Sequence, residues 1–207
     1  VAASGIGTVC IGVRCEEEPG KGLRLADAAE LARSLERLGD RLSSDWRVHA
    51  RVEVTDEGSV EALAEVLACS TRMALVSIME HSAQRSRFGS EREHVEFYAR
   101  DWGLPVDEVE RIMERKHRGA LRADDRRVAA AELALAHGVL LGTHDDRSAE
   151  QVRAGAELGA TIAEFPLTME AARAANEHGM ITVLGAPNVV RGRSTSPGNL
   201  LASDAIR

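Results

Sequence analysis

The chain has 207 residues, of which 44% are hydrophobic and 29% are charged, and its formal net charge is −7. This composition indicates a globular protein with one sizeable core, and its acidic balance argues against a nucleic-acid-binding surface. No apolar run approaches the ~20 residues that cross a bilayer. The three cysteines have no zinc-type spacing and fit a reducing compartment. We therefore expect a cytoplasmic protein without a membrane or nucleic-acid partner, and the composition leaves its oligomeric state open.

Short apolar runs alternate along the chain with stretches of helical periodicity. Strand, helix, glycine and strand follow one another at about 20 residues per unit, which is typical of βαβ repeats. The predicted strands cover residues 5–13, 48–54, 73–79, 139–144, 161–165 and 181–185. The predicted helices cover residues 25–38, 60–67, 128–137, 148–158 and 168–177, and a last one begins near residue 200.

Two segments depart from this repeat. Residues 89–127 are rich in Arg, Glu and Asp and are interpreted as an insertion of solvated helices, with a lid over a site as the alternative. Residues 186–193 are expected to form a loop after the sixth strand.

Six strands fit two α/β folds. An open doubly wound sheet is the first choice from the count alone, because a (β/α)₈ TIM-type barrel needs eight strands. Nearly every predicted strand ends in polar residues, however, and a closed ring brings all its strand ends to one centre. We therefore predict a single, incomplete barrel domain over residues 1–207, with a helical insertion at about 89–127.

Histidines and carboxylates stand at the ends of these strands. The run 139–146 begins as a strand that is expected to be buried on both faces, and it passes into His144, Asp145 and Asp146. Other strands end in Glu53 or are followed by His81. Imidazole and carboxylate are the ligands of Zn²⁺ or Mn²⁺, and Asp145 or Asp146 could then move a proton or orient His144. Each histidine alone is better interpreted as a hydrogen-bonded strand terminus, but the set favours a metal site. The other histidines in helical contexts are expected at the surface, namely His94, His117, His137 and His178.

Several arginines suit an anionic ligand. Arg51 alternates with His49 and Glu53 along one strand, so the three side chains are expected on one face. Arg85, Arg87 and Arg191 lie in segments just past strand ends, where guanidinium groups bind phosphate bidentately. Taken singly, each loop arginine is more often merely solvated.

Four motifs carry a resemblance to a known family. They are Met79-Glu80-His81, Thr143-His144-Asp145-Asp146, Ile162-Ala163-Glu164-Phe165-Pro166 and Gly185-Ala186-Pro187-Asn188-Val189-Val190-Arg191-Gly192. In this order and spacing they resemble the phosphonate-degradation branch of the amidohydrolase superfamily.

The resemblance implies a metal-dependent (β/α)₈ hydrolase that releases pyrophosphate from a ribosyl alkylphosphonate triphosphate. It further implies Zn²⁺ or Mn²⁺, with two ions in a complete site, and a small phosphorylated sugar as substrate. The resemblance places Glu53, His81 and His144 where metal ligands are expected. We further predict Asp145 and Asp146 as the catalytic residues. The predicted substrate-binding residues are Arg51, Arg85, Arg87, Glu164, Asn188 and Arg191.

The sequence also departs from the superfamily pattern. Its first-strand His-x-His and its last-strand aspartate do not occur within residues 1–207. Two other functions therefore stay open: an amidohydrolase that acts on a C–N bond, and a non-catalytic relative that binds phosphorylated ligands.

Overall fold

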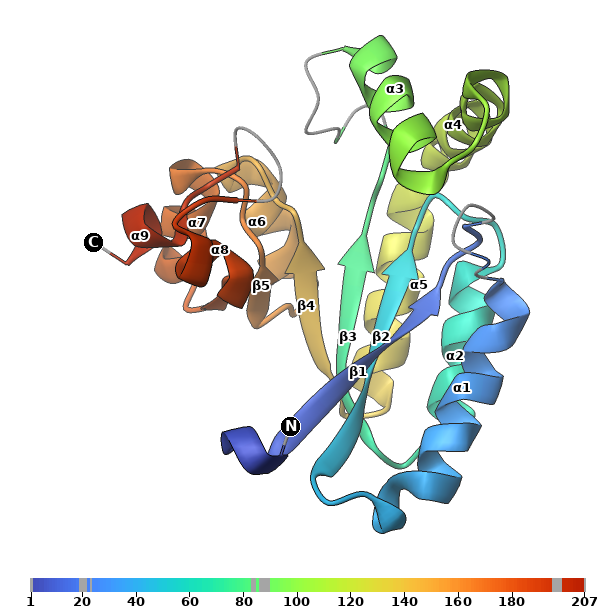
Figure 1. The fold of residues 1–207 in the computed structure, drawn as a ribbon, viewed down its shortest axis with the longest axis vertical. Coiled ribbons are helices and arrows are strands. Elements are labelled where there is room, and N and C mark those ends of the chain that lie inside the picture. Colours follow the sequence, from blue (N-terminus) through green and yellow to red (C-terminus); the bar gives the residue numbers. More distant parts are fainter. Residues whose placement is uncertain are drawn as a thin grey trace. The chain divides into compact units, whose positions relative to one another are not determined.

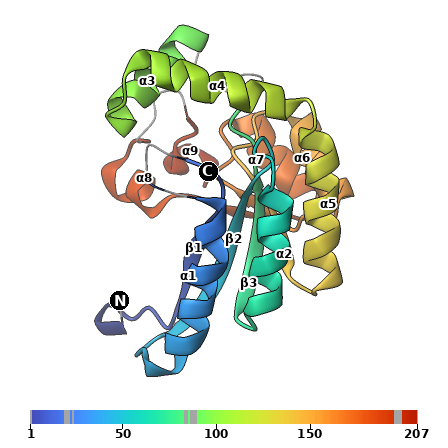
Figure 2. The same cartoon turned by 90° about the vertical axis from the view of Figure 1, so that its right-hand side faces the viewer.

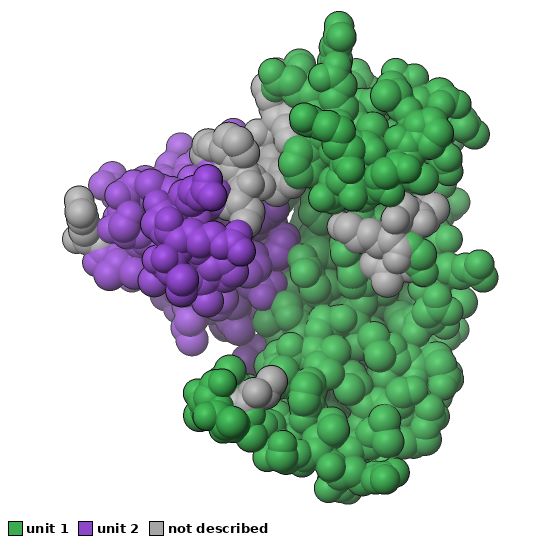
Figure 3. Space-filling view, viewed as in Figure 1, with its two compact units in different colours: residues 1–139 green, residues 140–207 purple. Residues whose placement is uncertain are grey.

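The computed structural model describes residues 2–18, 22, 24–82, 85, 90–194 and 199–206. The chain divides into two compact units, Val1–Val139 and Leu140–Arg207 (Figure 3). Each unit combines parallel strands with helices, as the predicted repeat requires. A single barrel domain over the whole chain stays a prediction.

The described residues of unit 1 form three parallel strands in chain order (Figure 1). Its strands are β1 (Thr8–Cys15), β2 (Asp45–Glu53) and β3 (Met73–Met79). Its helices are α1 (Leu25–Leu38), α2 (Ser59–Cys69), α3 (Glu91–Trp102), α4 (Val106–Ala120) and α5 (Ala123–Ala136), with short 3-10 turns at Ala2–Ser4 and Gly39–Arg41. The second strand therefore begins three residues before its predicted start, at Asp45.

The two faces of β2 explain why this unit folds as it does. Val48, Ala50 and Val52 alternate along one face and are completely buried. Helices α1, α2 and α5 pack against the strands of this unit, and Figure 2 shows them together on one side of the sheet. Burial of one apolar face under helices is the main stabilising contribution here.

The opposite face of β2 is polar, and three of its residues contact β3 or the residues just after it. His49 hydrogen-bonds Ser77 at 2.6 Å, and Arg51 lies 3.1 Å from the sulfur of Met79. Glu53 hydrogen-bonds His81, which lies two residues after the end of β3. The prediction that His49, Arg51 and Glu53 share a face is confirmed.

The insertion contains α3 and α4. Ser90 caps α3 by accepting a hydrogen bond from the backbone N–H of Glu93. One face of α4 is buried and carries Val109, Ile112 and Lys116, so the interpretation as solvated helices fails for this face. The surface prediction for His94 on α3 is wrong as well, because that residue is only 4% exposed and its ring packs 5.0 Å from Tyr98.

Unit 2 repeats the alternation with shorter elements. Its strands are β4 (Leu140–His144), β5 (Ile162–Glu164) and β6 (Ile181–Val183), and they pair in parallel. Its helices are α6 (Ala149–Glu157), α7 (Met169–Glu177), α8 (Ala186–Arg191) and α9 (Ala202–Ala205). Ser148 and Thr168 cap α6 and α7 by accepting backbone hydrogen bonds. Gly159 and Gly179 take positive φ after those helices, which confirms the predicted stops.

Two predictions fail in unit 2. Residues 186–193 are not a loop throughout, because α8 covers most of them. Pro187 is compatible with a first helical turn, where its missing N–H has no partner to lose, and Gly192 ends the helix at φ 62°. The fourth strand was expected to be buried on both faces, but Leu140 is 54% exposed.

The described residues thus contain six strands that alternate with helices, and every described pairing between neighbouring strands of a unit is parallel. This confirms the α/β fold class and is consistent with part of a (β/α)₈ barrel. Among the described helices, none combines the length and apolar character that a membrane span needs.

Candidate metal centre

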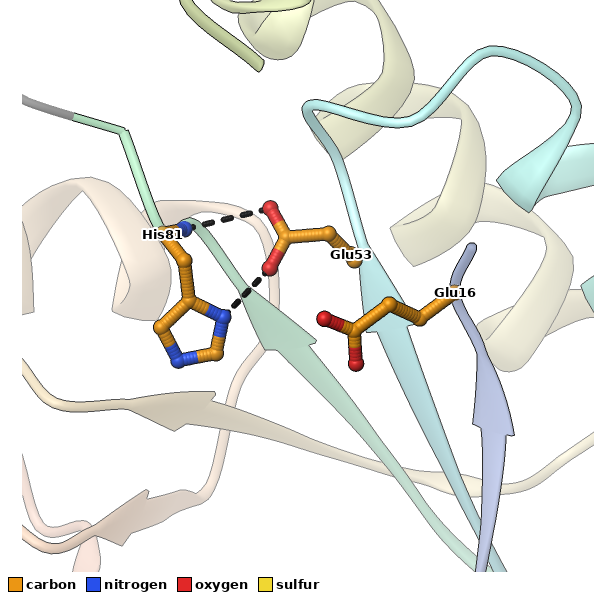
Figure 4. Close-up of side chains that lie close together, drawn as sticks. All are labelled: Glu16, Glu53 and His81. Carbon is orange, nitrogen blue, oxygen red and sulfur yellow. Dashed lines mark hydrogen bonds and ion pairs between the residues drawn. The ribbon is translucent and has the colours of Figure 1, made fainter. Parts of the chain in front are cut away.

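Glu53 and His81 meet at the carboxyl ends of β2 and β3. Glu53 is the last residue of β2 and has no exposed surface. One of its oxygens, Oε2, lies 2.5 Å from Nδ1 of His81 (Figure 4). The other, Oε1, accepts from the backbone N–H of His81 at 3.1 Å and from the Thr55 hydroxyl at 2.6 Å. These bonds fix both the carboxylate and the imidazole in orientation.

Glu16 joins this pair from β1. It directly follows that strand, and Figure 4 shows its carboxylate on the same side as the Glu53 and His81 side chains. Glu16, Glu53 and His81 each offer a ligand atom within 4.8 Å of the others. Two carboxylates and an imidazole form a ligand set suited to Zn²⁺ or Mn²⁺.

Lys116 reaches the same cluster from α4. Its Nζ lies 3.4 Å from both carboxylate oxygens of Asp56 and 3.6 Å from Oε1 of Glu16. The lysine is only 3% exposed, and Asp56 and Glu16 are buried too. A buried ammonium group among buried carboxylates is stable only as part of such a paired cluster.

The pKa values of this cluster follow from burial and charge together. Burial raises the pKa of Glu53, but Lys116 and His81 outweigh it and hold that pKa far below its usual range. Burial lowers the pKa of His81, yet the Glu53 carboxylate beside it leaves that pKa above its ordinary value. Burial raises the pKa of Asp56 to about 6, although Lys116 opposes the shift. The pKa of Lys116 is raised because its carboxylate neighbours outweigh its burial, so it stays charged at neutral pH.

The arginines predicted to bind substrate are partly engaged within unit 1. Arg85 pairs through Nε with Glu80 at 3.1 Å, and Arg127 of α5 pairs with the same carboxylate. Glu80 therefore anchors both the segment after β3 and helix α5. Arg87 lies outside the described residues.

Unit 2 gathers a second set around His144. The Nδ1 atom of His144 lies 3.3 Å from Oε2 of Glu164, and its Nε2 lies 3.8 Å from Oδ1 of Asp145. The ring of Phe165 meets the His144 ring edge-on at 5.3 Å. The register pairs His144 with Glu164, and the residue after each has positive φ, at 58° for Asp145 and 55° for Phe165. Backbone in this region is costly for a side chain such as Phe and often marks a functional site.

The remaining predicted residues of unit 2 are placed separately. Asp146 is buried, and its backbone carbonyl accepts from Leu167 at 2.8 Å. The amide of Asn188 donates to the carbonyl of Leu200 and accepts from the N–H of Ala202, so it joins α8 to α9. Arg191 is exposed at the end of α8.

The structure therefore brings predicted residues together in two places. Glu53 and His81 form one group in unit 1, while His144, Asp145 and Glu164 form another in unit 2. A single centre that combines Glu53, His81 and His144 stays a prediction. Glu16 and Lys116 were missed by sequence reasoning. The signal for Glu16 was its position three residues after the end of a predicted strand, and the signal for Lys116 was its place on the helical face of Val109 and Ile112.

Parallel βαβ units with histidines and carboxylates just past their strands define a class of α/β proteins whose site lies at the carboxyl ends of the strands. No family model matches the chain. The chain is similar to the alpha-D-ribose 1-methylphosphonate 5-triphosphate diphosphatase of Escherichia coli (strain K12), with 33% identity over 207 residues. The match covers 99% of this chain and 54% of that protein, so the chain spans about half the length of this curated relative. This confirms the expected resemblance to a diphosphatase of this kind along the chain, whereas the amidohydrolase superfamily stays a prediction.

Proposed function

We propose that the protein containing this chain is a metal-dependent hydrolase of phosphonate catabolism, related to the amidohydrolase superfamily. It cleaves a phosphoanhydride bond of a ribosyl alkylphosphonate triphosphate and releases pyrophosphate. The observation that carries the proposal is the group formed by Glu16, Glu53 and His81 in a chain 33% identical to a diphosphatase.

The residues of unit 1 suit a divalent ion, either Zn²⁺ or Mn²⁺. Glu16, Glu53 and His81 combine the oxygen and nitrogen donors that both ions accept. A bound ion supplies Lewis-acid polarisation of phosphoryl oxygens. Glu53 serves either as a ligand or as the group that orients His81, and both roles require its carboxylate to stay ionised, as its lowered pKa indicates.

In this proposal, residues of unit 2 transfer the proton. Asp145 lies next to His144 and is partly exposed, so its carboxylate is accessible to accept or deliver a proton. Glu164 holds the ring of His144 through Nδ1, which leaves its Nε2 side directed toward Asp145. Asp146 is the alternative proton carrier, although its burial favours Asp145.

Arginines bind the polyphosphate in this proposal. Arg85 and Arg191 follow β3 and β6, where anionic groups of a substrate at the strand ends would lie. Arg51 stands two residues before Glu53 on the polar face of β2. Guanidinium groups bind phosphate oxygens in pairs, which suits an extended triphosphate.

The experiment uses the full-length protein, stripped of metal by a chelator and reloaded with Zn²⁺ or Mn²⁺. Pyrophosphate release from alpha-D-ribose 1-methylphosphonate 5-triphosphate is measured alongside hydrolysis of an amide substrate. We expect release to require metal and to fall more than about 100-fold in His81→Ala, because even changes beside a metal ligand cost 10–100-fold. His178→Ala is the matched control, because His178 is exposed at the end of α7.

Metal content gives a second measurement on the same samples. His81→Ala is expected to bind less metal than the wild type, whereas His178→Ala is expected to bind the same amount. Pyrophosphate release that is equally fast without metal, or that survives His81→Ala, would refute the proposed function. Faster turnover of the amide substrate would identify the C–N hydrolase instead.

A further inference from the structure

Lys116 belongs to a helix that lies outside the strand–helix repeat. Helix α4 follows α3 in the insertion, yet its buried residues Val109, Ile112 and Lys116 fall on one face by helical spacing. Gly119 continues the same face one turn later. This face brings a lysine to the carboxyl ends of β1 and β2.

The position of α4 is fixed by backbone contact. A Cβ atom built on Gly119 would lie 1.8 Å from the carbonyl oxygen of Thr55, so only glycine allows this approach. Arg126 donates from Nη1 to the carbonyls of Val54 and Gly119, each at 2.9 Å. The helix that carries Lys116 is thus joined directly to the segment that follows Glu53.

The carboxylates around Lys116 outnumber the one positive charge that the lysine brings. Glu16, Glu53 and Asp56 bring three carboxylates to the cluster, and Lys116 brings one ammonium group. Arg14 pairs with Glu16 and with Glu18, so Arg14 and Glu18 add no net charge between them. The pKa of His81 is raised without metal, but a histidine that binds a metal is neutral, and in that state the formal charge of this described cluster is about −2, which one divalent ion would balance.

We propose that Lys116 is a resident counter-ion of the metal centre, which shares the Glu16 carboxylate with the divalent ion and thereby lowers the affinity of the site for that ion. This inference rests on the proposed function, because it assumes that a divalent ion binds at Glu53 and His81. Without metal, Lys116 compensates the buried carboxylates and keeps the cluster folded. With metal, its charge opposes that of the ion, so binding is weaker than the ligands alone would allow.

The test measures the dissociation constants of Mn²⁺ and Zn²⁺ for the metal-stripped, full-length protein by competition with a fluorescent chelator. Lys116→Met removes the charge with little change in volume and is expected to tighten binding by about tenfold or more, because a like charge a few ångströms from a dication repels it. Lys116→Arg keeps the charge and is expected to change affinity by less than about threefold. Arg118→Met is the matched control, because it removes an exposed charge from the same helix.

The outcomes separate this inference from the proposed function. Suppose that the wild type binds metal and His81→Ala does not, as the proposed function requires. A metal affinity of Lys116→Met that is unchanged or weaker then overturns the inference about Lys116 and leaves the proposed function standing. A wild type that binds no divalent ion overturns the proposed function and the inference with it.

Folding of Lys116→Met gives a further criterion. A variant that folds only when metal is present supports the counter-ion role. If Lys116→Met folds neither with metal nor without it, the double variant Lys116→Met/Asp56→Asn tests the inference instead. The double variant removes one positive and one negative charge together, so no carboxylate is left without its partner. We then expect a folded protein whose metal affinity is at least that of the wild type, and a double variant that stays unfolded or binds more than about tenfold more weakly overturns the inference.

Discussion

Replacement of Gly119 by alanine tests how firmly α4 is held against the end of β2. The added Cβ would lie 1.8 Å from the Thr55 oxygen, whereas ordinary contacts begin at 3.4 Å, so the helix must move by about 1.6 Å. Alanine gains about 1 kcal/mol of helix propensity over glycine. Overpacking against a backbone that cannot rotate away costs about 3 kcal/mol, at the upper end of the usual range. We expect Gly119→Ala to lower the free energy of unfolding by about 2 kcal/mol.

Urea unfolding of the metal-stripped, full-length protein, followed by circular dichroism, measures this difference. Gly7→Ala is the matched control, because nothing lies within 4 Å of its added Cβ and its φ is not left-handed. The control is expected to be neutral or stabilising by up to about 1 kcal/mol. A Gly119→Ala variant as stable as the wild type would show that α4 does not lie on Thr55, and it would remove the structural basis for placing Lys116 in the cluster.

Three further predictions concern separate features. Thr168→Ala removes the cap of α7 and should lower stability by about 1 kcal/mol in thermal unfolding, and no change would contradict the described cap. In urea unfolding, the free energy of unfolding of Phe165→Gly should exceed that of Phe165→Ala by about 0.5–1 kcal/mol, because only glycine adopts φ 55° without strain. A more stable Phe165→Ala would contradict the positive φ at residue 165. In the metal-stripped protein, the raised pKa of His81 means that its stabilising contribution is complete below about pH 6.5 and is lost as pH rises through the folded pKa. The stability difference between wild type and His81→Ala should therefore shrink from pH 6 to pH 9, and a constant difference would exclude the Glu53–His81 interaction.

Much of the fold could be predicted because its signals are local. Apolar runs, caps at Ser148 and Thr168, and glycine stops follow from the residues themselves and their immediate neighbours. The helix over Ala186–Arg191 was missed because Pro187 and Gly192 together suggest a turn, although proline is also suited to a first helical turn. The exposed Leu140 was missed because an apolar run does not reveal how well each of its faces is covered.

The candidate site was predictable only in part, because local signals do not show which charged residues pack together. Glu53 and His81 could be paired from sequence because parallel strands align their ends, and the structure brings them to 2.5 Å. Glu16 stands in a run of charged residues that is usually solvated, and Lys116 stands among charges on a polar helix. The spacing of Val109 and Ile112 marks the buried side of α4. Only tertiary packing shows that Lys116 on this side meets the carboxylates of Glu16 and Asp56.

The contacts of α4 also bear on whether the insertion acts as a lid. A movement that lifted α4 from the strand ends would separate Lys116 from Asp56 and Glu16, and it would break the bridge that Arg126 makes between the Val54 and Gly119 carbonyls. Removing the cation from a buried ion cluster costs about 3–5 kcal/mol when the carboxylates stay buried. This is a large share of the stability of a typical domain, so α4 is better described as a fixed wall of the site than as a lid. Its fixed position is also what makes a charge on this helix able to set the affinity for an ion at the strand ends.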